Sequence, residues 1–484
     1  MKNKQILVFV LCSVLCVPVV AQDTKTKAEK RAAAKSHLQQ HFKPYGFIRN
    51  YFAFDSRESM SGTGDLYNYQ PKDERWNQTE AQAAASGVER QDLNAQSTFR
   101  FLTLTTRLGL NIVGYKWRNT EFGAKIEADF YAGLNGVGTQ THKLSGTAQL
   151  RLRQAYLTMA WDSLRMNSKD VARVDLLIGQ AWHPMAADLS DVIALNSGAP
   201  FGPFSRTPQV RLDAKLGKYF TLTGAVIWQM QYNSTGPEGQ SAEYIAYSKT
   251  PEAFLGLSFH HKGAILRAGA DVLSICPRHE GAALGAAGLP ILDGAGKPIM
   301  VRVSDRITTV SPYLYFQYKK GDFSIKAKTI FAQAGEHMNL NGGYGIKAVN
   351  ADGSYEYTPT RNSSSWISIV YGGELGKTDK PKHKLQGILF AGYIRNFGTK
   401  DALVDANADG NPDLYFPRAN NMNRMWRLSP TLLWTVGKFQ LGIEYEITSV
   451  QYGRGAINAD NGLVDAGLHW VTNHRVQLMT KFNF

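Results

Sequence analysis

The sequence has few of the features that hold many proteins of this size together. Its 484 residues include only three cysteines, Cys12, Cys16 and Cys276, and the first two lie in an N-terminal segment that we expect to be removed. The single remaining cysteine excludes an internal disulfide. After that segment no apolar run approaches the roughly 18 residues of a membrane helix, and no repeat of fixed period appears. These absences argue against a disulfide-bonded scaffold, a helical membrane protein and a solenoid.

The first residues predict export. Lys2 and Lys4 precede an apolar stretch at 6–20, and Ala21 completes a small-residue cleavage site. This pattern is typical of a secretory signal peptide, which we assign to residues 1–21. A membrane anchor is the alternative, but the stretch is short and the polar residues after it give no stop-transfer context.

The charge of the chain is strongly basic. The formal net charge is +14, and removal of Lys2 and Lys4 lowers it to +12. A basic balance often indicates nucleic acid, but export makes that partner a poor fit. Small anionic solutes or anionic lipid headgroups suit an exported basic protein better. Residues 22–44 are polar and rich in Lys and Ala, and we expect a short periplasmic segment there.

What the sequence has in place of long apolar runs is regular alternation. Near the C-terminus, Val476, Leu478, Phe482 and Phe484 alternate with polar or basic residues such as Arg475. A period of two is typical of a strand whose faces meet different environments. We find sixteen such segments, at 45–56, 97–114, 117–132, 147–161, 172–181, 207–216, 219–232, 252–261, 263–275, 305–319, 322–335, 361–376, 384–397, 422–436, 438–452 and 468–484.

The connections between these segments alternate in length. Long ones, such as 57–96, 182–206 and 276–304, take turns with tight ones, such as 217–218 and 437–438. An even strand number with long loops at one end and tight turns at the other is typical of a transmembrane β-barrel. A soluble β-sandwich is the alternative, but it has no reason to keep that order. We therefore predict an all-β fold, an antiparallel sixteen-stranded barrel over residues 45–484.

Parity along the strands predicts which side chains face the lumen. We count fifteen basic against ten acidic inward residues, which gives a net positive channel that favours small anions. The alternative for each is pairing with a neighbouring acid to hold the strands in register. Arg151 and Arg153 are our best candidates for selectivity because Arg binds carboxylate or phosphate bidentately. The basic residues expected to line the channel include Arg49, Arg107, Lys125, Arg151, Arg153, Arg173, Arg211, Arg267, Lys326, Lys328, Arg427, Arg475 and Lys481.

The connection after the fifth strand is unusually apolar, and we predict that it folds inward as a constriction loop. It carries Trp182, His183, Asp188 and Asp191, and the two aspartates are expected to face the basic wall. The alternative is a loop that caps the barrel or packs on a neighbouring subunit. His183 could suggest catalysis, but no Ser or Cys nucleophile motif accompanies it. We therefore expect no enzyme activity.

One outer loop has the spacing of a calcium site. Asp405, Asn407, Asp409 and Asp413 follow the D-x-N-x-D-G pattern of calcium loops, but Phe416 takes the position of the bidentate Glu. The alternative is a simple polar turn, and calcium could also bridge lipopolysaccharide phosphates there. The sequence indicates no other cofactor.

Several short stretches resemble known outer-membrane proteins. The terminal Phe484, with Phe482, Leu478 and Val476 in step, resembles the signal that the barrel assembly machinery reads, and the Ala21–Gln22 junction resembles Bacteroidetes exports. The runs LRLRQAYLTM, LLIGQAWHPM and WRLSPTLLWTVGKFQLGIEYEIT resemble the DcaP-like trimeric porin family. The resemblance implies a homotrimer in the outer membrane that passes small, often anionic solutes. The long N-terminal coiled coil of that family is not seen.

A passive diffusion channel is therefore the leading hypothesis. A surface receptor or adhesin, with a plugged lumen and binding through its loops, fits the long 57–96 connection equally well. An outer-membrane hydrolase would need a Ser/His or Asp/His constellation that the sequence does not display. Only the channel requires an open lumen, so conduction distinguishes the three.

Overall fold

The computed structural model describes residues 38–62, 67–103, 105–134, 144–166, 169–285, 288–375 and 383–484. The predicted signal peptide and most of the predicted periplasmic segment lie outside these residues. Within them, no helix is both long and apolar enough to cross a membrane.

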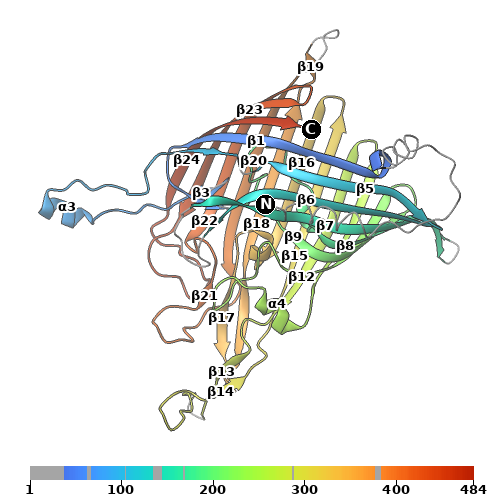
Figure 1. Cartoon of the computed structure of the whole chain (residues 1–484). Coiled ribbons are helices and arrows are strands. Elements are labelled where there is room, and N and C mark those ends of the chain that lie inside the picture. The colour runs from blue at the N-terminus through green and yellow to red at the C-terminus, as the bar shows by residue number, and fades with distance from the viewer. Residues whose placement is uncertain are drawn as a thin grey trace, which may run out of the picture.

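The chain forms a closed antiparallel β-barrel of sixteen strands, as predicted (Figure 1). The sheet closes because β1 pairs with β24 along one edge, with Phe47 opposite Asn483, and with β4 and β5 along the other, with Phe42 opposite Ile112. The strands of the wall are β1 (Phe42–Asp55), β4 and β5 (Thr98–Leu102 and Arg107–Trp117, counted as one), β6 (Thr120–Leu134), β7 (Leu144–Met166), β8 (Lys169–Trp182), β9 (Arg206–Leu216), β10 (Phe220–Ile227), β11 (Glu252–His261), β12 (Ala264–Ile275), β15 (Ile307–Lys320), β16 (Phe323–Gln333), β18 (Tyr355–Tyr371), β20 (His383–Thr399), β22 (Met422–Val436), β23 (Phe439–Tyr452) and β24 (His469–Asn483).

Short elements lie in the connections between the wall strands. Among them β13, β14, β17, β21 and α4 lie in the lower part of Figure 1, whereas β19 lies at the top. Several of them pair: β17 continues the sheet beside β18, while β13 with β14 and β2 with β3 form two small separate sheets. They are β2 (Ser59–Gly62), β3 (Tyr67–Pro71), α3 (Glu80–Ser86), η1 (Pro184–Ala186), α4 (Glu243–Ser248), β13 (Glu280–Ala282), β14 (Met300–Arg302), η2 (Gly335–Met338), β17 (Tyr344–Val349), β19 (Glu374–Leu375) and β21 (Leu414–Tyr415).

The strand boundaries differ from the predicted ones in a few places. β1 begins at Phe42 rather than 45, because its first residues pair with β5. β18 begins at Tyr355 rather than 361, because it runs past the wall to pair with β17. β10 ends at Ile227 rather than 232, and there the Gln229 side chain binds the backbone N–H and the hydroxyl of Ser234 and turns the chain.

The barrel wall has its apolar face outside and its polar face inside. Along β24, Val476, Leu478 and Phe482 are exposed, while Arg475 and Gln477 are buried. This is the reverse of a soluble sheet, which buries its apolar face. It is the pattern of a wall between lipid and a polar interior. Tight turns join neighbouring strands at the other end; between β22 and β23 Gly437 adopts φ 54°, which a glycine adopts at no steric cost.

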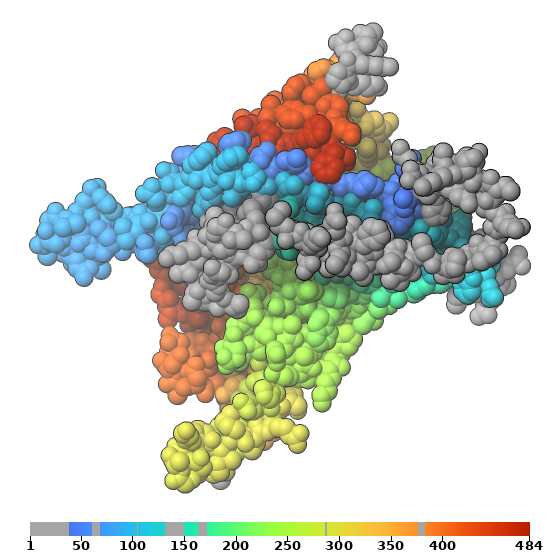
Figure 2. Space-filling view, viewed as in Figure 1, coloured from blue at the N-terminus to red at the C-terminus, as the bar shows by residue number. Residues whose placement is uncertain are grey.

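Residues 72–97 form a projection that we call the arm. Figure 2 shows it as a separate lobe in blue, and Figure 1 places α3 at its far end, away from the wall. No residue of α3 is buried. The arm is structured by its own contacts, including an isolated bridge between Trp76 and Asp92 and an Arg90 guanidinium 4.0 Å from the centre of the Trp76 ring.

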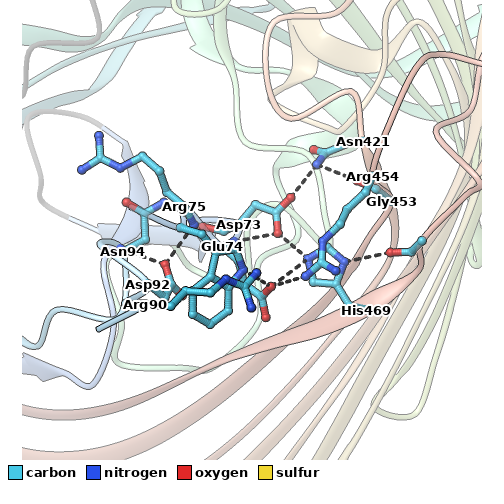
Figure 3. Close-up of polar contacts among 12 residues, drawn as sticks. Asp73, Glu74, Arg75, Arg90, Asp92, Asn94, Asn421, Gly453, Arg454 and His469 are labelled. Carbon is cyan, nitrogen blue, oxygen red and sulfur yellow. Dashed lines mark hydrogen bonds and ion pairs between the residues drawn. The ribbon is translucent and has the colours of Figure 1, made fainter. Parts of the chain in front are cut away.

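The base of the arm is fixed to the barrel by a polar cluster (Figure 3). The Asp73 carboxylate accepts a hydrogen bond of 2.7 Å from Asn421 and lies 2.7 Å from Nε2 of His469. Arg454 forms an ion pair with Glu74 beside it. The arm therefore leaves the barrel in a defined direction although its tip has no partner in this chain's described residues.

Candidate solute channel and its inner loop

The connection between β8 and β9, residues 183–205, lies inside the barrel, and we call it the inner loop. Its backbone is held from several sides of the wall. Lys328 of β16 donates to the carbonyl oxygens of Met185 and Asp188, each at 2.7 Å. On other strands, Tyr51 donates to the Ile193 carbonyl at 2.6 Å and Glu444 accepts from the Ile193 N–H at 3.0 Å. These strands lie far apart around the barrel, so the loop crosses the lumen.

Apolar side chains of the inner loop explain why it folds inward. Met185 and Phe201 are fully buried in a cluster that includes Trp366 and Phe390 of the wall. Ile193 packs against Tyr51 in a second cluster. Each large side chain buried in this way contributes roughly 1.5–3 kcal/mol relative to exposure. These interior contacts hold the loop inside the barrel.

The two aspartates predicted for the loop both meet basic residues of the wall. Asp188 forms an ion pair with Arg267 of β12. Asp191 lies 2.6 Å from the ammonium of Lys326 on β16. Both acids therefore face basic residues of the wall, and they anchor the loop on the β12–β16 side. Whether they also set a field for solutes stays a prediction.

On the opposite side of the inner loop lies a basic cavity of about 220 Å³. Arg151 binds Asp129 through two nitrogens, at 2.9 and 3.0 Å. Arg153 bridges Glu127 at 2.9 Å and Asp129 at 2.6 Å. The lining of the cavity also includes the loop residues Leu189, Leu195 and Ser197, and the basic residues Arg49, Arg107, Arg151 and Arg153 of the wall.

The charges around this cavity do not balance. Arg107 lies 3.7 Å from Glu127, which already serves Arg153, so Glu127 and Asp129 are shared among several guanidinium groups. The wall arginines therefore do pair with neighbouring acids, but the acids are fewer than the arginines. A surplus of fixed positive charge around a cavity of this size raises the local concentration of anions.

A further buried arginine beside this cavity, Arg206, was not predicted from the sequence. Its side chain is 2% exposed and lies 5.0 Å from the ring of Trp182. Its Nε donates to Gln231 at 3.0 Å. The residue falls at the last position of the predicted 182–206 connection, where strand parity gives no direction, so the alternation could not assign it inward. The predicted loop residue Trp182 itself ends β8 and also lies 6.0 Å below Arg153.

The other predicted channel residues fall into two groups. Arg173 and Arg211 pair with Asp175 at 2.7 Å and Asp213 at 3.0 Å, and both are partly exposed. Three more are buried and hold other parts of the chain. Lys328 binds the inner loop, Arg427 donates to the carbonyl oxygens of Ala199 and Tyr69 at 3.1 and 2.8 Å, and Arg475 lies 3.7 Å from Asp55.

Each of these three buried cations contacts another part of the chain, which strand parity alone did not predict. Lys328 is 3% exposed, and Arg427 and Arg475 are similarly buried. The parity argument places them inward, and the inner loop and β3 then cover Lys328 and Arg427. Unlike Arg107, Arg151 and Arg153, none of these three lines the basic cavity.

The predicted calcium loop is held by hydrogen bonds between its own groups. Asp413 accepts from the backbone N–H groups of Ala406 and Asn407 at 2.7 and 3.2 Å. Asp405 accepts from those of Asp409 and Gly410 at 3.0 and 2.7 Å. The oxygens thus cap turns, and calcium binding stays a prediction.

The predicted assembly signal lies at the seam of the barrel. Val476, Leu478, Phe482 and Phe484 are exposed on the outer face, and the backbone N–H of Phe484 donates to the Gly46 carbonyl at 3.1 Å. These contacts fix the last residue beside β1. The recognition role of the four residues stays a prediction. Cys276 is buried at the end of β12.

No family model matches the sequence, and no curated protein does. The outer membrane channel DcaP of Acinetobacter baumannii has a similar structure, with a TM-score of 0.58 and 18% identity over 92% of this chain and 97% of that one. An anion-selective porin from Comamonas acidovorans scores 0.45 at 8% identity, over 92% and 99% of the two chains, which is too low to carry an argument. The likeness to DcaP shows that this chain has the fold of an outer-membrane channel.

Proposed function

We propose that this protein is an outer-membrane porin through which small hydrophilic anions diffuse passively. The observation that carries the proposal is the basic cavity beside the inner loop, where Arg49, Arg107, Arg151 and Arg153 outnumber the acids Glu127 and Asp129. An apolar outer face suits lipid, and a polar interior suits water. In this proposal the protein catalyses no reaction and acts without a cofactor.

The inner loop is proposed to be the constriction. It crosses the lumen and leaves the basic cavity on one side, so solutes would pass between Leu189, Leu195 or Ser197 and the arginines. An anion that enters exchanges part of its hydration for guanidinium contacts, whereas a cation meets repulsion. The proposal further includes export through residues 1–21, assembly through the C-terminal residues, contact with lipopolysaccharide, and a homotrimer.

The test is single-channel recording of the refolded protein in a planar bilayer under a KCl gradient. We expect stepwise openings and a reversal potential that shows chloride preference. Replacement of Arg151 and Arg153 by Gln removes two positive charges and leaves Glu127 and Asp129 less compensated, so the preference should shift toward potassium.

The matched control is the double variant Arg173→Gln and Arg211→Gln, which removes two arginines that pair with Asp175 and Asp213 and do not line the cavity. It should leave the reversal potential almost unchanged. A folded barrel that conducts nothing would contradict the porin and favour the receptor hypothesis. Equal shifts from the control and from the cavity variant would assign the preference to overall charge and not to the cavity.

A further inference from the structure

Four ionisable side chains meet in the interior where the inner loop leaves β8. His183 is the first residue of the loop, Glu252 begins β11, Asp271 lies in β12 and His337 belongs to η2. Their exposed fractions are 0%, 0%, 1% and 2%. Neither channel lining nor loop anchoring through Asp188 and Asp191 uses these groups. We call them the buried ring.

The imidazoles and carboxylates alternate around the ring. Nε2 of His183 lies 2.7 Å from Oε1 of Glu252 and 3.5 Å from Oδ1 of Asp271. Nε2 of His337 lies 3.8 Å from Oε2 of Glu252 and 3.5 Å from Oδ2 of Asp271. Each carboxylate thus offers one oxygen to each histidine. The ligand atoms of His183, Glu252 and Asp271 converge, and Nε2 of His337 lies beside the two carboxylates.

Three of these atoms make no hydrogen bond within the part of the chain that the structure describes. They are Oε2 of Glu252, Oδ1 of Asp271 and Nε2 of His337. Buried polar atoms are nearly always paired, and carboxylate oxygens are among the costliest to leave unpaired. Oε2 of Glu252 and Nε2 of His337 lie 3.8 Å apart, and Oδ1 of Asp271 lies 3.5 Å from Nε2 of His183, so these unpaired atoms point to a bound partner between the four side chains.

We propose that the buried ring binds a divalent transition-metal ion of the zinc type. A tetrahedral zinc with ligand bonds of about 2.0–2.2 Å holds its donor atoms about 3.4 Å apart. Three of the four separations in the ring are 3.5, 3.5 and 3.8 Å. Ligand atoms of His183, Glu252 and Asp271 all lie within 4.8 Å of one another. Only the 2.7 Å hydrogen bond between His183 and Glu252 has to open.

The chemistry of the donors also suits such an ion. Imidazole nitrogen with carboxylate oxygen favours zinc and its neighbours over calcium or magnesium. Nδ1 of His337 lies 3.2 Å from the Ala334 carbonyl, which can only accept, so that nitrogen carries a proton and Nε2 is the ligand atom. With both rings neutral, the two carboxylates carry a charge of −2, which a divalent ion cancels.

Metal binding has two identifiable costs. Burial lowers the pKa of His337, but Glu252 and Asp271 outweigh it and raise that pKa to about 9, so the ion displaces a proton from Nε2. The Met185 N–H lies 3.2 Å from Nδ1 of His183 and donates to it. A metal on Nε2 leaves the ring proton on Nδ1, so this contact is given up. In return the ion ties the start of the inner loop to β11, β12 and η2.

The first test is the zinc content of the refolded full-length protein after dialysis against zinc and then against metal-free buffer. We expect one zinc per chain by mass spectrometry. Glu252→Gln and His337→Gln each remove a ligand and should abolish retention. His469→Gln is the matched control, because His469 also lies beside two carboxylates, 2.7 Å from Asp73 and 4.0 Å from Glu74, but at the base of the arm (Figure 3).

The outcomes separate the proposal from its rivals. Zinc retained by His469→Gln and lost by both ring variants supports it. No retained metal in the wild-type protein overturns it and leaves the ring as a protonated ion-pair network. Equal retention by all variants assigns the zinc to other surface groups and also overturns it. If the ring variants do not fold, X-ray absorption spectra at the zinc edge of the wild-type protein test the proposal. The ring predicts two imidazoles and only nitrogen or oxygen ligands, and a different ligand set overturns it.

Discussion

The inner loop and the arm are both long connections of this barrel, yet one folds into the lumen and the other leaves the molecule. The inner loop, 183–205, contains Met185, Ile193 and Phe201, all of which are buried. The arm, 72–97, is dominated by polar residues and alanine, and its helix α3 buries nothing. The length of a connection therefore does not decide its place. Its apolar content does, because only apolar side chains gain from the packed interior.

The two segments also differ in how they are fixed. The wall holds the inner loop along its whole length, through Lys328, Tyr51 and Glu444. Among the described residues, the arm is fixed at its base, where Asp73 and Asp92 bind neighbouring segments. We infer that a change in the loop alters the channel, whereas a change in the arm stays local.

The largest effect is expected from Phe201→Ala in the inner loop. Phe201 is fully buried against Phe390, with ring centroids 6.0 Å apart. Truncation of a buried Phe costs about 3–5 kcal/mol. The loop should loosen, and single-channel current should become larger and noisier. Val88→Ala in the arm, where Val88 is exposed, is the control and should change neither.

A smaller effect is expected from Asp92→Asn at the base of the arm. Asp92 lies 2.6 Å from Arg57 and accepts hydrogen bonds from the N–H groups of Arg75 and Asn94. Loss of a charged acceptor here costs about 1–3 kcal/mol. Limited proteolysis should cut the arm faster. Unit conductance should stay the same, and a change in it would contradict the separation of the two regions.

The same carboxylate makes the arm sensitive to acid. Burial raises the pKa of Asp92, but the N–H groups of Arg75 and Asn94 and the Arg57 guanidinium outweigh it and lower that pKa. A lowered pKa stabilises the fold above the ordinary value of about 3.9, and this contribution is lost as the pH falls toward the lowered value. Pepsin should therefore cut the wild-type arm increasingly as the pH falls below about 4. The Asp92→Asn arm should show a weaker pH dependence.

The smallest effect is expected from Thr79→Ala at the start of α3. Thr79 accepts from the Gln82 N–H at 3.2 Å, and the Gln82 side chain accepts from the Thr79 N–H at 2.9 Å. Loss of such a cap costs about 1 kcal/mol. Hydrogen exchange should accelerate in α3 alone. Acceleration in β22 or β24 would show that the arm and the wall are coupled.

The barrel could be predicted from the sequence because its strands separate two solvents. In β24, Val476 and Leu478 point outward and Arg475 and Gln477 inward, which is a period of two. The apolar character of the 182–206 connection favoured an inward fold, and its role as a constriction stays a prediction. Parity gives the side to which a residue points but not what covers it, so the burial of Lys328 beneath the loop could not be predicted.

The buried ring could not be predicted from the sequence for a related reason. Its four residues lie far apart in the sequence. His183 and His337 belong to connections, Glu252 begins β11 and Asp271 lies within β12. No short motif joins them, and only the closure of the barrel and the inward fold of the loop bring them together. Arg206 escaped because it lies at a strand end, where alternation carries no information.

The most direct test of the account is a pair of deletions measured by single-channel recording. One variant replaces residues 187–202 of the inner loop with a short glycine–serine linker, and the other replaces residues 77–91 of the arm in the same way. The account predicts a larger unit conductance and a weaker chloride preference for the first, and wild-type values for the second. Unchanged conductance without the inner loop, or altered conductance without the arm, would contradict it.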